Sequence, residues 1–329
     1  MWFWLSLLAM LCWSGSDIFS KIGSKQNDKN SHWKVTFAVG LIMGVHFVIT
    51  LIGAAVINST VGIDALEATA GGKILASLFY TDFVFMDFVR YLPVATLYIL
   101  AMVFGYISLR YIELSISSPI CNCSGALAFV LCLIFGIYSS EDVTKTVIIG
   151  VALITVGIVA LGFVENYEDA EVKAARQEKA NRKYAKSFLA FLLPITYLII
   201  DALGTVGDEF IFSIEGPNNE GIISDYAANS AFEFTFLLVA VFSFIWIKFV
   251  KKDKLLSGNR HLYLGGACET VGQIFYMSVL FSDYSEGMVI ISAYCAVSVL
   301  WSRIFLKEKL SWKHYAAIAC AFAGIVMLG

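Results

Sequence analysis

Apolar runs long enough to cross a membrane fill most of this chain of 329 residues. A helix needs about 20 apolar residues to span the hydrocarbon core of a bilayer. Hydrophobic residues make up 59% of the chain and charged residues 15%, which is more apolar surface than one water-soluble core buries. We therefore predict an all-α polytopic membrane protein with ten transmembrane helices. The predicted spans cover residues 2–22, 33–57, 89–110, 115–137, 144–164, 187–211, 226–249, 261–282, 285–306 and 311–329.

The final stretch, residues 285–329, repeats an earlier one, and an internal repeat constrains the fold of the whole chain. At a shift of 167 residues Glu308 falls on Glu141, and each stretch has an apolar run, an acidic break and a second apolar run. Identical pairs at this shift include Ser118 and Ser285, Ala126 and Ala293, Val130 and Val297, Leu133 and Leu300, and Gly157 and Gly324. A second alignment, at a shift of 184 residues, is chosen because it matches Asp17 with Asp201.

The chain therefore reads as two homologous halves joined by a linker. Residues 1–164 form the first five-helix repeat and residues 188–329 form the second. Residues 165–187 are rich in Glu, Lys, Arg and Ala, which predicts a charged, solvated linker. Residues 58–88 are an insertion in the first repeat, and their apolar residues at helical spacing predict a short helix in the membrane interface.

Basic residues gather on one side of the predicted membrane. That side collects the lysines and arginines of the loops at 21–34, 173–186 and 248–260, whereas the other side has only Lys73, Arg90 and Lys145. The positive-inside rule makes the rich side cytoplasmic and places both termini outside. Since five spans is an odd number, the two halves must be inverted relative to each other. Inverted repeats are typical of secondary transporters, whose substrate site lies near the midplane between the halves.

Three motifs narrow the interpretation. Residues 13–17 read Trp-Ser-Gly-Ser-Asp, a passage from Arg110 to Ser118 enters the fourth span, and the acidic break at Glu308 repeats the one at Glu141. Together these resemble the drug/metabolite transporter superfamily, specifically its EamA-like ten-helix branch. The resemblance covers essentially the whole chain and implies a carrier with a central cavity that moves small metabolites, amino acids, nucleotide sugars or drugs by alternating access. The insertion departs from the short bacterial members, and outside termini differ from the cytosolic termini of many relatives.

Other classes of protein lack support in the sequence. The sequence contains no GxxxxGK[ST] stretch, the ATP-binding motif that an ATP-driven pump requires. All seven cysteines fall inside predicted spans without a paired CxxC beside histidines, which indicates packing residues and no metal site. The four histidines are too scattered to predict an enzyme. We expect no cofactor and no nucleic-acid partner, and a monomer or homodimer in the plasma (inner) membrane.

Acidic residues inside predicted spans are the first candidates for function, because burying an ionisable group in a membrane is costly. Asp17, Asp201 and Glu269 are our candidates for binding a proton or a cationic substrate. Competition between proton and substrate for one acid predicts an antiporter. Asp17 stands at helical spacing from Lys21, so an ion pair between them is an equal alternative. We expect interfacial positions for Asp208 and Glu209. Glu233 is also a candidate, but it lies nearer an end of its span, and a helix-terminal or surface role is an equal alternative.

Aromatic and polar side chains in the apolar spans complete the candidate site. The further residues predicted to line it are Trp13, Tyr98, Asn122, Gln273, Tyr276 and Tyr294. Aromatic faces bind cations, and amide groups inside a membrane must find hydrogen-bond partners. For each aromatic residue, packing or anchoring at the interface is the more common role. Trp301 belongs to the same group of candidate aromatics.

These observations favour a secondary transporter, proton-coupled and working by alternating access, for a small cationic or zwitterionic metabolite or drug. The alternative within transport is a carrier that exchanges anionic metabolites with the help of Lys21, Arg110 and Arg303. A passive channel and an intramembrane enzyme remain alternatives from other classes.

Overall fold

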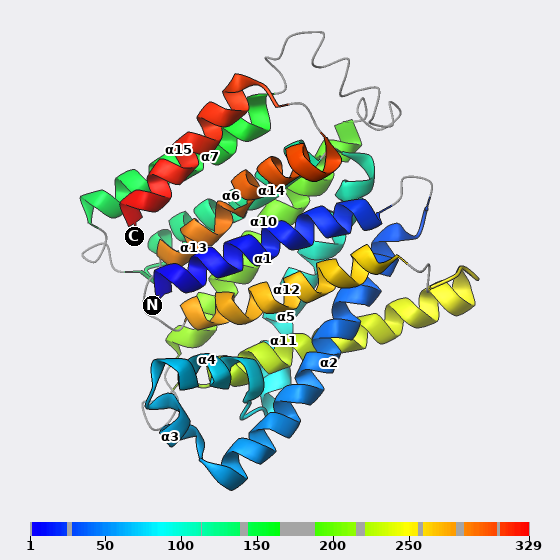
Figure 1. Cartoon of the computed structure of the whole chain (residues 1–329), viewed down its shortest axis with the longest axis vertical. Helices are drawn as coiled ribbons and strands as arrows, with labels where there is room; N and C mark the ends of the chain where they lie inside the picture. Colours follow the sequence, from blue (N-terminus) through cyan, green and yellow to red (C-terminus); the bar gives the residue numbers. More distant parts are fainter. Residues whose placement is uncertain are drawn as a thin grey trace.

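The computed structural model describes residues 2–24, 28–112, 114–138, 144–164, 188–214, 221–255, 259–280, 286–307 and 310–328. The predicted linker at 165–187 and both acidic breaks, at Glu141 and Glu308, lie outside the described residues. Within the described ranges the chain folds almost entirely into helices (Figure 1).

A helix occupies each predicted span. These helices are α1 (Trp2–Gly23), α2 (Ser31–Thr60), α5 (Phe85–Tyr111), α6 (Leu114–Ile134), α7 (Lys145–Val164), α10 (Phe188–Ser213), α11 (Asp225–Ile245), α12 (Arg260–Leu280), α13 (Glu286–Ser292) with α14 (Tyr294–Trp301), and α15 (Trp312–Leu328). Wider π-helical turns, η2 (Trp246–Val250) and η3 (Ser302–Leu306), extend α11 and α14. The apolar runs therefore locate the helices, although α2 continues beyond its predicted end.

Membrane-spanning character is clear from length and composition for six segments of the described chain. They are Trp2–Gly23, Ser31–Thr60, Phe85–Tyr111, Ser117–Ile134, Asp225–Val250 and Val289–Leu306, and two shorter apolar helices lie at Lys145–Leu161 and Trp312–Met327. The protein is thus an integral, multi-pass membrane protein, as predicted. That all ten helices span the membrane stays a prediction.

The insertion contains two short helices where one was expected. These are α3 (Ile63–Glu67) and α4 (Ala70–Phe79), and the Thr69 hydroxyl caps α4 by accepting a hydrogen bond from the Gly72 amide. Helix α4 folds back onto α2 and α12. Contact with α2 is close, because a Cβ added to Gly53 would lie 2.0 Å from the Phe79 carbonyl oxygen. Figure 1 shows α3 and α4 beside the lower half of α2.

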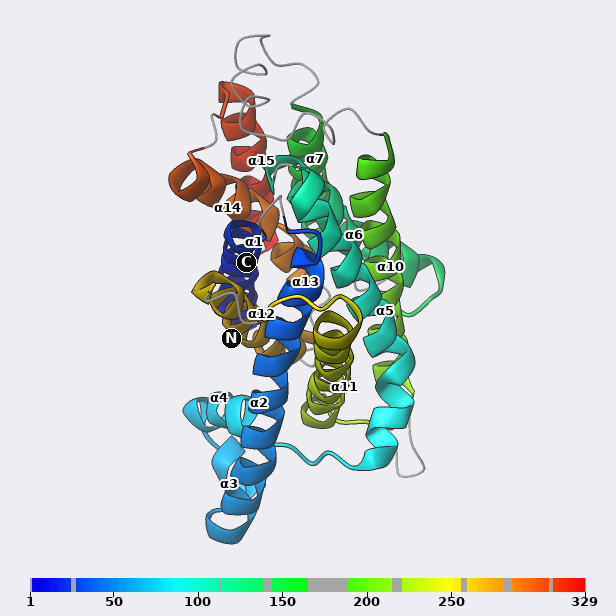
Figure 2. The same ribbon diagram turned by 90° about the vertical axis from the view of Figure 1, so that its right-hand side faces the viewer.

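Helices from the two halves interleave rather than forming separate bundles (Figures 1 and 2). Helix α1 packs along α12 of the second half, and α10 packs along α5 of the first. Helix α2 packs on α11, α7 packs on α15, and α6 contacts both α13 and α14. Both halves of the chain therefore contribute helices to one shared core. Such a core can hold a site whose residues come from both halves.

Small residues set the closest of these approaches, as expected for helices that pack in lipid. We predict that Gly40→Ala destabilises the protein by about 1–3 kcal/mol, the usual cost of overpacking. A Cβ on Gly40 would lie 2.4 Å from the Phe236 carbonyl oxygen of α11. This oxygen belongs to the backbone, so it cannot move aside as a flexible side chain could. Gly71→Ala is the matched control, since nothing lies within 4 Å of its added Cβ. Thermal unfolding in detergent measures both variants, and equal melting temperatures would contradict the prediction.

Candidate functional site

A central cavity of about 100 Å³ lies between the two halves. That volume has room for several water molecules or a small solute. Helices α1, α5, α6, α10, α11, α12, α13 and α14 all contribute to its wall. The structure brings to this one wall all nine residues proposed from the sequence: Trp13, Asp17, Tyr98, Asn122, Asp201, Glu269, Gln273, Tyr276 and Tyr294. Polar side chains in apolar helices turn inward because lipid offers them no hydrogen bonds.

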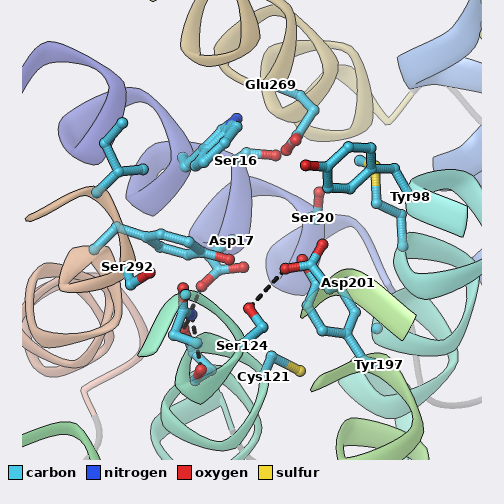
Figure 3. A pocket seen from close by; sticks show the side chains of 18 of the residues that line it. Ser16, Asp17, Ser20, Tyr98, Cys121, Ser124, Tyr197, Asp201, Glu269 and Ser292 are labelled. Carbon is cyan, nitrogen blue, oxygen red and sulfur yellow. Dashed lines mark hydrogen bonds between the residues drawn. The ribbon is translucent and has the colours of Figure 1, made fainter. Parts of the chain in front are cut away.

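Three carboxyl groups face the cavity, and Figure 3 shows them directed into the same space. Asp17 accepts hydrogen bonds from the hydroxyls of Ser118 and Ser298, at 2.5 and 2.9 Å. Both bonds fall on Oδ2, so Oδ1 of Asp17 keeps its capacity to accept from a ligand. Asp201 accepts from the Ser124 hydroxyl at 2.6 Å. These serines hold the two aspartates in place without neutralising them.

The third acid, Glu269, comes from α12 and lies beside Ser16 of α1 (Figure 3). No Lys, Arg or His belongs to the cavity wall among the residues that the structure describes. None of the ion pairs found in the same residues involves Asp17, Asp201 or Glu269. The cavity therefore presents concentrated acceptor capacity and negative character.

The basic residues proposed for an anionic substrate lie elsewhere. The Lys21 ammonium donates to the backbone carbonyls of Leu109 and Ile112 at the end of α5. The Arg110 guanidinium stands over its neighbour's ring, 5.1 Å from the Tyr111 centroid. Arg303 belongs to η3 and is exposed. None of the three residues lines the cavity.

Hydrogen-bond donors without partners also line the cavity. The Trp13 Nε1, Ser20 Oγ, Tyr106 OH and Gln273 Nε2 atoms are buried and have no hydrogen-bond partner among the described residues. Buried polar atoms are almost always satisfied, so four orphans around one cavity indicate that water or a ligand satisfies them. Gln273 stands one helical turn along α12 from Glu269, which places a free donor next to an acid.

Aromatic rings enclose one end of the cavity. The Trp13 ring lies 5.2 Å from that of Tyr276 and 5.9 Å from that of Tyr294. The Tyr98 and Tyr276 hydroxyls are hydrogen-bonded at 2.9 Å. By contrast, Trp301 donates to the Ser14 hydroxyl and does not line the cavity. Packing thus accounts for Trp301. The aromatic residues that can contact a solute are Trp13, Tyr98, Tyr276 and Tyr294.

A helix break adjoins the cavity. Helix α13 ends at Ser292 and α14 begins at Tyr294, with Ala293 between them at φ −71° and ψ 2°. Both Ser292 and Tyr294 line the cavity. Irregular backbone at membrane depth is tolerated where it borders a cavity, and discontinuous helices mark the substrate sites of many transporters.

Burial contradicts the interfacial position expected for Asp208 and the surface role left open for Glu233. Asp208, expected at the interface, is fully buried and accepts hydrogen bonds from Tyr91 and Tyr98. Glu233, for which a helix-terminal or surface role was an equal alternative, is fully buried and pairs with His46, its Oε1 lying 2.7 Å from Nδ1. Their positions near the ends of apolar runs suggested exposure, but neighbouring helices extend past those ends and cover them.

Comparison with known proteins agrees with the sequence and the fold. The model of the EamA-like transporter family, part of the drug/metabolite transporter superfamily, matches residues 205–329. The predicted resemblance is thereby confirmed for this part of the chain. A solved structure described only as "Crystal structure of protein" shares the fold, with a TM-score of 0.58 and 14% sequence identity, over 98% of this chain and 95% of that one. No curated protein matches the sequence. The family match indicates a membrane transporter of small solutes.

Proposed function

We propose that the protein, whose residues 205–329 match a family of transporters and not of enzymes, is a proton-coupled antiporter of a small cationic or zwitterionic solute. One observation carries this proposal: Asp17, Asp201 and Glu269 face a single cavity with no basic side chain in its described wall. Three acids crowded in a low dielectric repel one another, and a bound cation or bound protons relieve that repulsion. Solute and proton then compete for the same oxygens, which couples their movements in opposite directions.

The unpartnered donors refine the solute class. A purely cationic solute satisfies carboxylates but leaves Trp13 Nε1 and Gln273 Nε2 without acceptors. A solute that also carries a carbonyl, hydroxyl or carboxylate oxygen satisfies both kinds of group. An amine with an acceptor group a few bonds away, including a zwitterion, is therefore the ligand that fits best. An anionic solute lacks support because Lys21, Arg110 and Arg303 lie away from the wall.

Alternating access by inverted repeats is the second part of the proposal. Reciprocal contacts between α7 and α15 support it. A Cβ on Gly157 would lie 2.8 Å from the Ala317 carbonyl oxygen, and one on Gly324 would lie 2.6 Å from that of Gly150. At the shift of 167 residues Gly157 aligns with Gly324, and Gly150 aligns with Ala317. The contact of Gly157 with Ala317 is therefore equivalent to the contact of Gly324 with Gly150. A two-fold axis relates contacts in this way.

The contact between Cys320 and Leu153 lies on that axis. The Cys320 thiol is 3.4 Å from the Leu153 carbonyl oxygen, and the two residues are equivalent at the same shift. Contacts between the two helices join earlier residues of α7 to later residues of α15: Gly150 contacts Gly324, and Gly157 contacts Ala317. The two helices therefore run antiparallel. Equivalent helices that run antiparallel support halves of opposite orientation in the membrane.

The second alignment, at a shift of 184 residues, gains the same kind of support. A Cβ on Gly105 would touch the Tyr197 ring at 2.9 Å, and one on Gly272 would touch the Trp13 ring at 2.5 Å. Gly105 aligns with Gly272 at the shift of 167 residues, and Trp13 aligns with Tyr197 at the shift of 184. The contact of Gly105 with Tyr197 is therefore equivalent to the contact of Gly272 with Trp13. Since these contacts do not involve the acids used to choose the alignment, they independently support Asp17 and Asp201 as equivalent positions.

Transport by the purified full chain in liposomes tests the function. We expect counterflow, saturable uptake and acceleration by an outwardly directed proton gradient, with solutes first selected by thermal stabilisation of the protein, since a ligand of the folded state raises its apparent stability. An amine series with and without an acceptor group tests the solute class. Uptake that never saturates would indicate a channel, chemical change of the solute would indicate an enzyme, and selection of anions alone would overturn the proposal.

The orientation is also part of the proposal, with both termini outside the plasma (inner) membrane. We expect a fluorescent reporter that matures only in the cytoplasm to stay dark when fused after Gly329, because the basic loops hold the opposite side inside. The same reporter placed in the loop at 251–255 is the matched control and should fluoresce. A bright C-terminal fusion would reverse the assigned orientation.

A further inference from the structure

A fourth buried acid, Asp208, lies directly beyond the cavity on α10. It is fully buried and stands one turn past Thr205, the last residue of α10 that lines the cavity. Its Oδ1 accepts from the Tyr91 hydroxyl at 2.5 Å, and its Oδ2 accepts from the hydroxyls of Tyr98 at 2.6 Å and Tyr276 at 3.5 Å. We call these four residues, Asp208, Tyr91, Tyr98 and Tyr276, the Asp208 cluster.

The Asp208 cluster lies at one end of the cavity. Tyr98 and Tyr276 line the wall at that end, whereas Asp208 and Tyr91 lie behind them and do not line it. Its members come from α5, α10 and α12, so the carboxylate ties helices of both halves together. This end of the cavity is the one near which helix α5 begins and helix α10 ends. A solute that leaves in this direction must pass between helices that the cluster joins.

No cation neutralises Asp208 in the described part of the chain. The ion pairs found there do not include it. The groups that face it are the three tyrosine hydroxyls; of the nearby acids, Glu209 lies next to Tyr138 and Asp201 lies on the cavity side of Tyr98. An acid held by hydroxyls alone, deep in an apolar helix, is costly to retain and calls for a functional explanation.

The cluster is absent from the equivalent place at the other end of the cavity. If it served packing alone, the internal repeat would favour similar residues at both ends. Under the two shifts described above, Asp208, Tyr98 and Tyr276 are replaced by Ser24, Gly265 and Leu109. Among the described residues, these equivalent positions therefore carry neither an acid nor the hydroxyls that bond to it.

We propose that Asp208 is a positioning residue whose protonation releases Tyr98 and Tyr276 and opens this end of the cavity, an inference that rests on the proposed transport function. The ionised carboxylate only accepts hydrogen bonds. It takes them from the Tyr91 and Tyr98 hydroxyls, while the Tyr276 hydroxyl, 3.5 Å away, shares its hydrogen with Tyr98. A protonated carboxyl donates from one oxygen, so a tyrosine hydroxyl on that oxygen must accept instead and turn its own hydrogen to another acceptor. For Tyr98 that acceptor is the Thr205 hydroxyl, which lies 3.2 Å away. This rearrangement loosens the contacts of α5 and α12 with α10 at the cavity end.

Two measurements on the full chain in detergent test this proposal without any solute. Infrared difference spectra between acidic and alkaline pH should contain the carbonyl band of a protonated carboxyl that Asp208→Asn removes. After correction for the intrinsic pH dependence of amide exchange, protection from hydrogen–deuterium exchange in residues 91–98 and 273–280 should decrease as the pH falls in the native protein. Asp208→Asn should lose this pH dependence. Glu209→Gln changes the neighbouring acid of the same helix and should retain both signals.

Tyr91→Phe provides a second test if Asp208→Asn does not fold. It removes one donor from the carboxylate but leaves the cavity wall intact, so exchange in residues 91–98 should already be raised at neutral pH. Unchanged exchange in Tyr91→Phe, or normal pH dependence in Asp208→Asn, would overturn the role of Asp208. Absence of transport by the native protein would instead overturn the proposed function, because the exchange signals require no transport.

Discussion

Asp201→Asn is expected to abolish proton-driven uptake and to weaken binding of a cationic solute by about 10- to 100-fold. A hydrogen bond to a charged group contributes about 1.5–3 kcal/mol, and 1.4 kcal/mol corresponds to a factor of ten in affinity. Asparagine preserves the shape of the side chain and its bond from Ser124, but it neither binds a proton nor carries charge. The same result is expected for Glu269→Gln. Uptake under a pH gradient measures coupling, and solute-dependent thermal stabilisation measures affinity.

Two further variants separate charge from structure. Ser124→Ala removes the donor that holds Asp201 and leaves the acid, so we expect weaker binding with proton coupling retained. Asp64→Asn removes an exposed acid of α3 far from the cavity wall and should behave as the native protein. The assignment of the acids fails if Asp201→Asn and Glu269→Gln both keep normal proton coupling.

Hydrophobic periodicity and length sufficed to locate the helices. Apolar runs of about 20 residues have few alternatives to a membrane helix, so their positions follow from the sequence alone. Helix ends were less accurate, because α2 continues to Thr60 in a polar stretch that reads as a loop. The turn at Ala293 between α13 and α14 was also missed, since no proline or glycine marks it.

The cavity wall was predictable for the same physical reason. Inside an apolar helix a polar group must turn towards other helices, so Asp17, Asp201, Glu269 and Gln273 could be assigned to one interior before their contacts were known. The serines that hold the aspartates were missed. Ser118 and Ser124 belong to a helix with many small residues, and nothing in sequence distinguishes a packing serine from one that bonds an acid far along the chain.

Contacts across long sequence separations explain the remaining errors. Asp208 and Glu233 find their partners in other helices, and no local pattern connects Glu233 with His46. The insertion adds to this, because the Leu78 carbonyl of α4 lies 3.0 Å from the second ring nitrogen of His46. A segment predicted to lie at the membrane surface thus contacts the buried pair that Glu233 forms with His46.

That pair leads to the largest stability effect that we predict. The Glu233 side chain is fully buried and the His46 side chain is 15% exposed. His46 Nδ1 lies 2.7 and 2.9 Å from the two Glu233 oxygens, while Nε2 faces the Leu78 carbonyl, so acceptors flank both nitrogens. Either the ring carries two protons or Glu233 carries one. In both cases the pair shares one proton, and no net charge is buried without a partner.

His46→Leu is therefore expected to destabilise the protein by about 3–5 kcal/mol, because it leaves the Glu233 carboxyl buried with Asn229 as its one remaining donor among the described residues. The double variant His46→Leu, Glu233→Leu should be more stable than this single variant, since apolar residues remove the unpaired acid. Glu233→Gln should cost less, because the amide can donate to Nδ1 while Nε2 donates to Leu78. Arg90→Ala provides the control: Arg90 pairs with Asp87 but its side chain is 44% exposed, so the loss should be about 1 kcal/mol or less. Unfolding in detergent gives the order of stabilities, and a double variant less stable than His46→Leu would show that the pair is not held together by the need to neutralise a buried acid.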